Sequence, residues 1–322
     1  MLVLSEKDIK NSLTMEEAIN VMEEAFLKYA NNEFVMPARN FSEVKGEDTL
    51  LVMPCFVDDC IGLKVVTSYP SNSTSSSPIT QGLVLINNRE TGDPLAIING
   101  TLLTAIKTGA VSGVAMRILM KDAESIGLIG TGLQGMYQLV AAVSSTSVKT
   151  IYLFNRSSEK IKKFIQEFRK VSVREINIIP VLDIMELVRH SQIIITATTS
   201  VSPVLPDESG LYNNKLIVGV GSYKSNMREL PQKLFEDSDY YYIDSEQGKV
   251  ECGDIIDPLE KGWVKNNQIV LLSDFFKGEL PISQNKNPIV FKNVSMALFD
   301  ASIGNYVYKK ARKLGIGQEI SL

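Results

Sequence analysis

A glycine-rich stretch at residues 125–135, S-I-G-L-I-G-T-G-L-Q-G, has the spacing of a turn that binds phosphate groups. An apolar run precedes the glycines and a helix-like segment follows at 136–143, and this strand, turn and helix context gives a G-x-G-x-x-G pattern its meaning. Gly130 permits the tight turn, Gly132 lets the backbone approach a pyrophosphate, and Gly135 lets the helix pack close to the strand. The helix start offers free N–H groups to phosphates, so the stretch predicts dinucleotide binding.

The next expected strand, at residues 150–155, ends where the ribose of a dinucleotide would lie. Sites that prefer NAD usually place Asp or Glu there, about 20 residues past the glycines. This chain has Asn155, Arg156 and Ser157 instead, so no carboxylate repels a 2′-phosphate and the Arg156 guanidinium can bind one. We therefore expect NADPH as the preferred cofactor, with NADH as the alternative. The competing interpretation is that Arg156 is only a solvated loop residue.

Further apolar runs after the glycine turn predict the strands of an open parallel sheet. They lie at residues 176–180, 192–198, 215–220 and 240–244. Open parallel sheets bind ligands beyond the carboxyl ends of their strands, so Thr198, Val220 and Ser222 are expected to face the cofactor. The fold class predicted for this part of the chain is α/β, a Rossmann doubly wound parallel sheet.

The first third of the chain has the pattern of a different, α+β domain. A capping box at residues 14–17, T-M-E-E, starts a helix with one apolar face. Strands are expected at 50–53, 61–66, 83–86 and 95–98, and a helix rich in small residues at 102–120. A last helix, from residue 295 to about residue 314, is expected to return to this domain.

Lys64 stands in the middle of the expected strand at 61–66, which is an unusual place for a charge. If both faces of the sheet are covered, Lys64 is a buried ammonium that needs an anionic partner. The alternative is a solvated strand lysine, and the sequence alone favours that simpler interpretation. Arg39 follows a Met-Pro-Ala segment, and Lys107 lies in the helix at 102–120.

Composition excludes several classes of function. The chain has 322 residues and a net charge of −4, so no basic surface indicates nucleic acid. We expect no membrane span, because we expect no apolar run to approach the roughly 18 residues required. The first residues lack the pattern of a signal peptide, and three cysteines are too few for a disulfide framework, so we expect a cytoplasmic protein with reduced thiols. The single histidine, His190, is interpreted as structural, and no metal site is expected.

Several motifs combine along the chain. Arg39 is followed by G-L-K at 62–64, T-x-G at 80–82, L-T-A-I-K-T-G-A at 103–110, the glycine turn at 130–135, and G-S-Y-K-x-x-M-R-E-L at 221–230. In this order they resemble the ornithine cyclodeaminase/mu-crystallin family over nearly the whole chain. The combination is specific, although no single piece is.

The resemblance implies a Rossmann dinucleotide-binding domain at residues 119–295, inserted into a substrate-binding and dimerisation domain formed by residues 1–118 and 296–322. It also implies a homodimer and a substrate site between the domains. By the same resemblance, Arg39 binds the substrate carboxylate, and Lys64 lies near the substrate amine or carboxylate. The other residues that it implies are cofactor contacts: Thr80, Leu133, Gln134, and Ser295 with Met296 near the nicotinamide.

Two positions depart from the family pattern. Lys107 stands where the family usually has arginine, so the charge survives but the two-pronged guanidinium does not. Tyr223 stands where true ornithine cyclodeaminases carry an aspartate that shuttles a proton and anchors the amine. This second departure resembles the branch of the family that reduces cyclic imines.

The leading hypothesis is an NADPH-dependent reductase of a small cyclic imino acid, such as the conversion of Δ1-pyrroline-2-carboxylate to L-proline. Arg39 would pair with the carboxylate, and Lys64 with Lys107 would hold the substrate anion and donate the imine proton. One alternative is ornithine cyclodeaminase, which forms L-proline and ammonia, with Glu229 or Asp244 replacing the missing aspartate. Another is a non-catalytic, NADPH-dependent binding protein of the mu-crystallin type.

Overall fold

The computed structural model describes residues 1–74, 78–282 and 285–321. Contacts divide the chain into two compact units, one formed by Met1–Lys107 with Met296–Leu322 and the other by Thr108–Ser295. The first boundary lies inside helix α3 (Gly100–Met120), and the second lies just before helix α10 (Ala297–Leu314).

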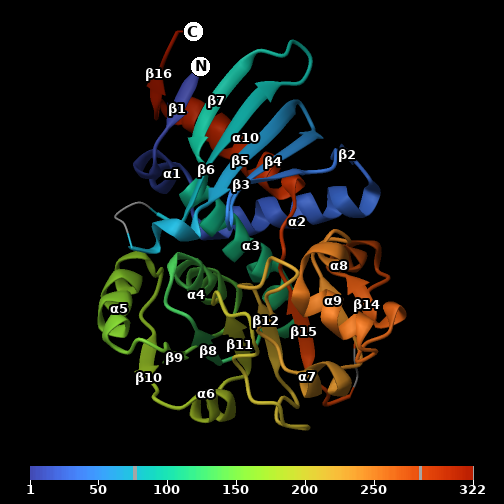
Figure 1. The fold of residues 1–322 in the computed structure, drawn as a ribbon. Coiled ribbons are helices and arrows are strands. Elements are labelled where there is room, and N and C mark those ends of the chain that lie inside the picture. Colours follow the sequence, from blue (N-terminus) through green and yellow to red (C-terminus); the bar gives the residue numbers. More distant parts are fainter. Residues whose placement is uncertain (75–77, 283–284, 322) are drawn as a thin grey trace. The chain divides into compact units, whose positions relative to one another are not determined.

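The first unit contains a sheet with the strand order β16-β1-β7-β6-β5-β4-β2, in which β3 also pairs with β4 (Figure 1). Strands β4 to β7 form an antiparallel meander, and β1 joins it in parallel along β7. The runs expected as strands are confirmed and are longer than expected. The strands are β1 (Leu2–Leu4), β2 (Phe34–Val35), β3 (Asn40–Lys45), β4 (Asp48–Val57), β5 (Cys60–Ser68), β6 (Thr80–Asn88), β7 (Pro94–Asn99) and β16 (Gln318–Glu319).

Helix α10 covers one face of this sheet and also packs against α2 (Met15–Asn31); the short α1 (Glu6–Ser12) lies next to α10. The predicted capping box is confirmed, because Thr14 and Glu17 satisfy each other's backbone N–H groups at the start of α2. Gly62 lets α10 approach β5, since a Cβ there would collide with Ala301. The covered face is buried, whereas apolar side chains on the other face, such as Leu63 and Leu85, stay partly exposed.

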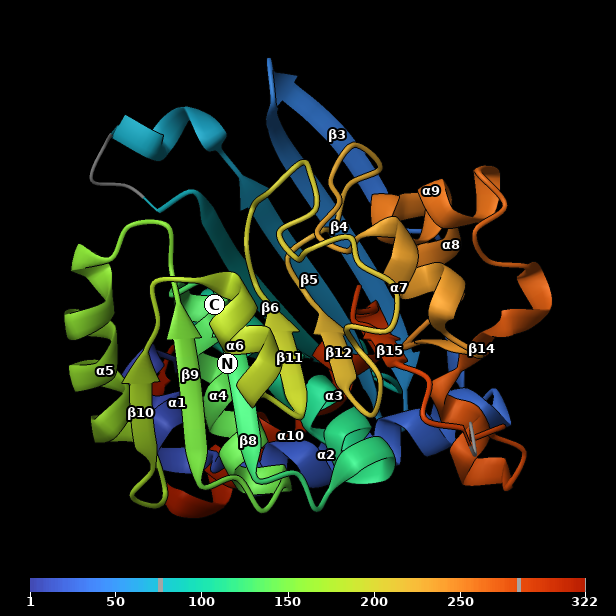
Figure 2. The same cartoon turned by 90° about the horizontal axis from the view of Figure 1, so that it is seen from below.

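The second unit is built on a sheet in which every pairing is parallel, with the order β10-β9-β8-β11-β12-β15-β13-β14 (Figure 2). The chain starts at β8, runs outward through β9 and β10, and then returns to add β11 and β12 on the other side. This reversal of direction is the doubly wound topology that was predicted. Its strands are β8 (Ser125–Ile129), β9 (Thr150–Phe154), β10 (Asn177–Pro180), β11 (Ile193–Thr196), β12 (Leu216–Gly219), β13 (Tyr241–Ile243), β14 (Ile269–Leu271) and β15 (Ile289–Lys292).

Strands β14 and β15 were not expected, and β15 inserts between β12 and β13 although it comes last in the chain. The connections contain short helices in addition to the crossover helices. They are α4 (Leu133–Ser145), α5 (Glu159–Val171), α6 (Ile184–His190), α7 (Gln232–Asp237), α8 (Gly248–Glu251) and α9 (Gly253–Glu260), and the 3₁₀ helices η2 (Asn266–Gln268) and η3 (Leu272–Lys277); η1 (Pro70–Thr74) belongs to the first unit.

Helix α3 corrects one expectation from the sequence. Its 21 residues are long and apolar enough to span a membrane by length and composition, so the expectation that no segment approaches that length was wrong. Most of the helix is buried within the protein, as in the core helix of a globular domain. Its small residues permit close packing, because a Cβ at Gly109 would collide with the Tyr137 carbonyl of α4.

His190 is exposed, whereas the three cysteines are buried. His190 ends α6, directly before β11, and its ring stacks on Tyr152 with centroids 5.2 Å apart. Cys55, Cys60 and Cys252 are all free and buried. Burial raises the pKa of the Cys55 and Cys60 thiols to about 12, so both stay protonated and unreactive at neutral pH.

Candidate functional site

The glycine turn of the second unit has the shape that a dinucleotide phosphate requires. Gly130 has a φ of 106°, and its N–H donates to the Phe154 carbonyl at 3.1 Å, which holds the turn against β9. A Cβ at Gly130 or Gly135 would collide with a backbone oxygen. Gly132 differs, because a Cβ there would meet nothing within 4 Å, so open space borders this part of the backbone.

The start of α4 adds hydrogen-bond donors to that open space. Gly132 is the N-cap residue and supplies no side-chain cap, which leaves the first N–H groups of α4 available to an anion. Leu133 is half exposed in the first turn. Within the described part of the chain, the buried Oε1 of Gln134 has no hydrogen-bond partner, but this oxygen is an acceptor and does not itself bind a phosphate oxygen. The residues present therefore fit the pyrophosphate of a dinucleotide.

The segment expected to meet the ribose follows β9. The Asn155 side chain accepts from the Thr131 N–H at 3.2 Å and donates to the Ser157 carbonyl at 2.9 Å. Asn155 thus ties the glycine turn to the 155–157 segment. Arg156 is exposed, and its side chain takes no part in these two hydrogen bonds of Asn155.

The other predicted cofactor contacts of this unit lie after neighbouring strands. Thr198 follows β11, Val220 follows β12 and Ser295 follows β15, and the three strands are adjacent and parallel. The carboxyl ends of parallel strands meet at one edge of a sheet, so these residues share the edge that carries the glycine turn. Ser295 has a φ of 70°, and its N–H donates to Asp244 at 2.6 Å.

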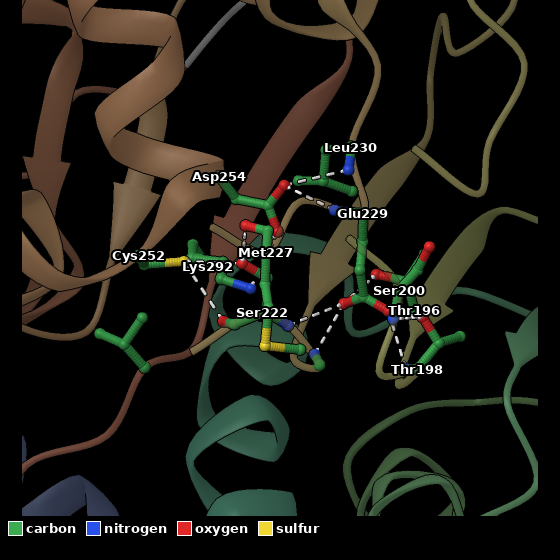
Figure 3. A network of polar contacts seen from close by, with 12 residues as sticks. Thr196, Thr198, Ser200, Ser222, Met227, Glu229, Leu230, Cys252, Asp254 and Lys292 are labelled. Carbon is green, nitrogen blue, oxygen red and sulfur yellow. Dashed lines mark hydrogen bonds and ion pairs between the residues drawn. The ribbon is translucent and has the colours of Figure 1, made fainter. Parts of the chain in front are cut away.

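A buried polar network joins the ends of β11 and β12, and Figure 3 shows its members. The Glu229 carboxylate accepts from the N–H and hydroxyl of Thr198, both at 2.7 Å, and from the Thr196 hydroxyl at 3.0 Å. It also accepts from the N–H groups of Gly221 at 2.7 Å and Ser222 at 3.3 Å. One side chain therefore fixes both loops at this edge.

A second layer of the network fixes Glu229 itself. Asp254 accepts from the N–H groups of Glu229 and Leu230 at 2.9 and 3.0 Å, and its other oxygen pairs with Lys292 at 3.1 Å (Figure 3). Burial alone would lower the pKa of Lys292, but the neighbouring Cys252, Asp254 and Glu229 raise it above its ordinary value. Lys292 is therefore a permanent buried cation on β15.

The network changes the interpretation of Ser222. This residue is fully buried, and its hydroxyl donates to the Met227 carbonyl at 2.6 Å and lies 3.2 Å from the Cys252 sulfur. The proton of this hydroxyl is therefore used inside the protein, so the hydroxyl does not donate to a cofactor in this arrangement, and the predicted contact of Ser222 stays a prediction.

The first unit contains a second candidate site, built on Lys64. This lysine points to the covered face of its sheet and is only 6% exposed, so the interpretation as a solvated strand lysine was wrong. Its anionic partner is Asp300, in the first turn of α10, at 3.2 Å. Lys107 on α3 approaches the same Asp300 oxygen at 3.1 Å and is fully buried.

The remaining predicted residues of this unit lie on the same sheet. Arg39 directly precedes β3, whose first residue, Asn40, pairs with Val52, and the next residue of β4, Met53, pairs with Lys64. Thr80 begins β6, four residues from Val84, which pairs with Lys64 on its other side. Among the residues predicted to act on the substrate, the structure brings Lys64 and Lys107 together through Asp300.

A phosphate cradle on a doubly wound parallel sheet defines the class of this protein, the Rossmann-fold dinucleotide-binding proteins. The chain belongs to the ornithine cyclodeaminase/mu-crystallin family, whose model matches residues 1–315. The predicted resemblance is thereby confirmed over nearly the whole chain.

The relatives of the chain within this family are similar over their full length. The Δ1-pyrroline-2-carboxylate reductase of Bacillus thuringiensis subsp. konkukian is 32% identical, over 99% of both chains. The Thermococcus litoralis Δ1-pyrroline-2-carboxylate reductase, solved with NADH and L-proline, is 32% identical with a TM-score of 0.92, over 99% of this chain and 100% of that one. An archaeal alanine dehydrogenase, a dimer solved with bound NAD, is 25% identical with a TM-score of 0.90, over 100% of this chain and 99% of that one.

Reasoning from the sequence missed Asp300 and the network of Glu229, Asp254 and Lys292. One signal was present for Lys292, which ends the apolar run 289–291 as a charge within a strand, as Lys64 does in β5. No comparable signal marked Asp300, which lies more than 190 residues from Lys107 along the chain.

Proposed function

We propose that this protein is an NAD(P)H-dependent reductase of small cyclic imino acids, converting Δ1-pyrroline-2-carboxylate to L-proline. The observation that carries the proposal is Lys64, a buried ammonium held by Asp300 on the covered face of a sheet. A buried charge of this kind is costly for stability alone, which favours a chemical role. The full-length similarity to two reductases of this name supports the choice of substrate.

The chain's own residues have distinct tasks in this reaction. Arg39 binds the substrate carboxylate, for which its planar guanidinium is suited. Lys64 donates a proton to the imine nitrogen, and Lys107 adds positive charge beside it. The cofactor, when bound at the glycine turn, supplies the hydride that reduces the carbon of the C=N bond.

Ornithine cyclodeaminase chemistry is less well supported. It needs a carboxylate for the substrate amine, and Tyr223, which is 47% exposed, stands at the position where this aspartate is expected. The two carboxylates that were considered as replacements for this aspartate, Glu229 and Asp244, already accept hydrogen bonds from backbone N–H groups. Glu229 accepts from Thr198, Gly221 and Ser222, and Asp244 accepts from the N–H groups of Val294 and Ser295.

The test is a set of assays on one preparation of the purified protein. We expect loss of absorbance at 340 nm with NADPH or NADH and Δ1-pyrroline-2-carboxylate or its six-membered homologue. Little or no ammonia should be released from L-ornithine, and pyruvate with ammonium tests the reaction named for the alanine dehydrogenase relative. Robust turnover of ornithine without turnover of imines would replace the proposal by the cyclodeaminase function. Cofactor binding without turnover of any substrate would favour the mu-crystallin type of binding protein.

We further propose that NADPH is preferred over NADH. The preference is supported by the exposed Arg156 after β9 and by an Asn155 side chain that is neutral and already hydrogen bonded within the turn. Neither residue repels a 2′-phosphate, and Arg156 can bind one. The solved relatives contain NADH and NAD, so the cofactors must be compared directly.

We also propose a homodimer in the cytoplasm. The uncovered face of the first sheet leaves apolar side chains partly exposed, among them Leu63, Val65 and Leu85, and Leu83 is 49% exposed. A second copy of the chain would bury this surface. Light scattering at micromolar concentration should give twice the chain mass of 35.6 kDa, and a monomer would refute the assembly.

The proposed cytoplasmic location is supported by the cysteines. Three free, buried cysteines fit a reducing compartment.

A further inference from the structure

Asp300 is a buried carboxylate of the first unit that pairs with two buried lysines. It is 2% exposed, and its Oδ1 atom lies 3.2 Å from the Lys64 ammonium and 3.1 Å from the Lys107 ammonium. Its Oδ2 atom accepts from Lys107 at 3.3 Å. One carboxylate thus joins a strand lysine to a helix lysine that is distant from it in the sequence.

The position of Asp300 on α10 favours its charged form. It lies in the first turn of the helix, whose N-cap Met296 supplies no side-chain cap, so the positive end of the helix dipole acts on the carboxylate. Burial raises the pKa of Asp300, but Lys107 and Lys64 lower it more, so the net shift is downward. Asp300 therefore stays ionised at neutral pH.

The other titratable groups near α10 in the described part of the chain are directed elsewhere or are uncharged. Besides Lys64 on β5 and Lys107 on α3, the Cys55 thiol on β4 interacts with the charge of Asp300. Burial, and to a lesser extent this charge, raises the pKa of Cys55 and keeps the thiol protonated. From α2, Glu17 is directed to Tyr306 and Lys310, further along α10. Asp59, in the β4–β5 turn, is directed to Asn305 and Lys309. Asp300 is thus the carboxylate that lies at ion-pair distance from both lysines.

We propose that Asp300 is a positioning residue for the reduction: it holds the Lys64 ammonium in one direction and keeps it protonated beside a second cation. The inference rests on the proposed function, in which Lys64 gives its proton to the imine nitrogen. In that step an N–H bond of Lys64 breaks as the N–H bond of the product forms. Lys64 is left as a neutral amine, which regains a proton from water, and Asp300 remains a carboxylate throughout.

The physical reason is the repulsion between two buried ammonium groups. Both ammonium groups approach the same oxygen of Asp300. When the charge of that oxygen is removed, two cations remain near each other without a carboxylate, which disfavours the protonated form of each lysine. A change of Asp300→Asn keeps the size of the side chain and removes the charge. The lysines should then lose their protons at lower pH.

A substrate-free measurement tests this directly. The protein is labelled with ¹³C at the lysine Cε atoms, whose chemical shifts follow protonation of the amine, and the signals are assigned by their loss in Lys64→Met and Lys107→Met. In Asp300→Asn we expect the titration midpoint of Lys64 to fall by about 1 to 3 pH units, the usual effect of losing a close opposite charge. An unchanged midpoint in a folded variant would overturn the proposal.

Two further variants guard against structural damage as the explanation. Lys107→Met removes the competing cation and leaves Asp300 to Lys64, so the Lys64 midpoint should rise, and a fall there would also overturn the proposal. Asp59→Asn is the matched control, because it removes an exposed carboxylate that pairs with Lys309 on the same helix. Its Lys64 midpoint should not move, and a shift equal to that of Asp300→Asn would contradict the specific role of Asp300.

Kinetics then separate this inference from the proposed function. With Δ1-pyrroline-2-carboxylate, the alkaline limb of the kcat profile of Asp300→Asn should move down in pH by the same amount as the Lys64 midpoint. An unchanged kcat profile would refute the positioning role while leaving the reductase function standing. If the unmodified protein reduces no imine, the proposed function fails, and the lysine titration still decides whether Asp300 controls the charge of Lys64.

Discussion

Two buried lysine clusters, one in each unit, have opposite charge balances. Lys292 on β15 faces two carboxylates, and each oxygen of Asp254 and Glu229 receives at least one donor at hydrogen-bond distance. Asp300 faces two lysines, and its ion pairs with other described residues are those with Lys64 and Lys107. The first cluster is saturated, whereas the second brings two cations to a single carboxylate.

Under the proposed function, this difference separates a structural network from a site for chemistry. The carboxylates beside Lys292 are committed to the backbone of the loops after β11 and β12, so they hold a shape and are not available to bind or transfer. Lys64 is held by one carboxylate and keeps a slight exposure, 6%, where Lys292 has none. A buried charge therefore indicates function most strongly where its neighbours do not saturate it.

Among the substitutions that we propose, removal of Lys292 from the saturated cluster should cause the largest loss of stability. Lys292→Met leaves Asp254 and Glu229 buried without their cation, so we expect the free energy of unfolding to fall by about 3–5 kcal/mol. Urea unfolding measures the change. The control is Lys309→Met, which breaks an exposed pair with Asp59 and should cost less than about 1 kcal/mol. Equal unfolding curves for Lys292→Met and the unmodified protein would contradict the comparison.

The unsaturated cluster should instead lose activity. Lys64→Met leaves Asp300 paired with Lys107, so no buried charge is orphaned and the stability loss should be smaller than for Lys292→Met. Imine reduction should fall by about 100-fold or more, the usual effect of a missing general acid. Arg39→Lys, which keeps the charge and loses the planar fork, should mainly raise KM. Steady-state kinetics decide, and full activity of Lys64→Met would show that the cluster is structural.

Arg156 is an exposed charge, so its removal should change cofactor affinity and not stability. We expect Arg156→Ala to narrow the affinity gap between NADPH and NADH by about 1–3 kcal/mol, the scale of a charge-assisted hydrogen bond, with little change in stability. Titration of both cofactors by calorimetry measures the gap. Equal affinities in the unmodified protein would remove the basis of the NADPH preference.

Glu17 should give the smallest effect, because its ion pair lies near the surface. Burial raises the pKa of Glu17, but bonds from Lys310, Thr14 and Tyr306 lower it to about 2, below its ordinary 4.5. A depressed pKa contributes stability that is complete above the unfolded value and is lost as pH falls from 4.5 toward 2. The difference in Tm between the unmodified protein and Glu17→Gln should therefore be largest near neutral pH and shrink in acid. A difference that grows on acidification would reverse the assigned sign.

Much of the fold followed from local pattern. The capping box at Thr14 and Glu17, the glycine turn and the strands of the doubly wound core were predicted, because propensity and periodicity act over a few residues. Strand β15 was missed because its four residues gain their place only by pairing with β12 and β13. The interpretation of Tyr223 as a departure from the true ornithine cyclodeaminases rests only on its position in the sequence and stays a prediction.

The sequence by itself determined the dinucleotide turn, the family and the presence of a lysine in the middle of a strand. Only the tertiary structure decided that Lys64 is buried, that Asp300 is its partner, and that Glu229 and Ser222 are committed to internal bonds. The physical reason is that burial and charge pairing join residues that are far apart along the chain. Asp300 lies beside Lys64 and Lys107 because α10 returns to the first sheet, and no local pattern contains that contact.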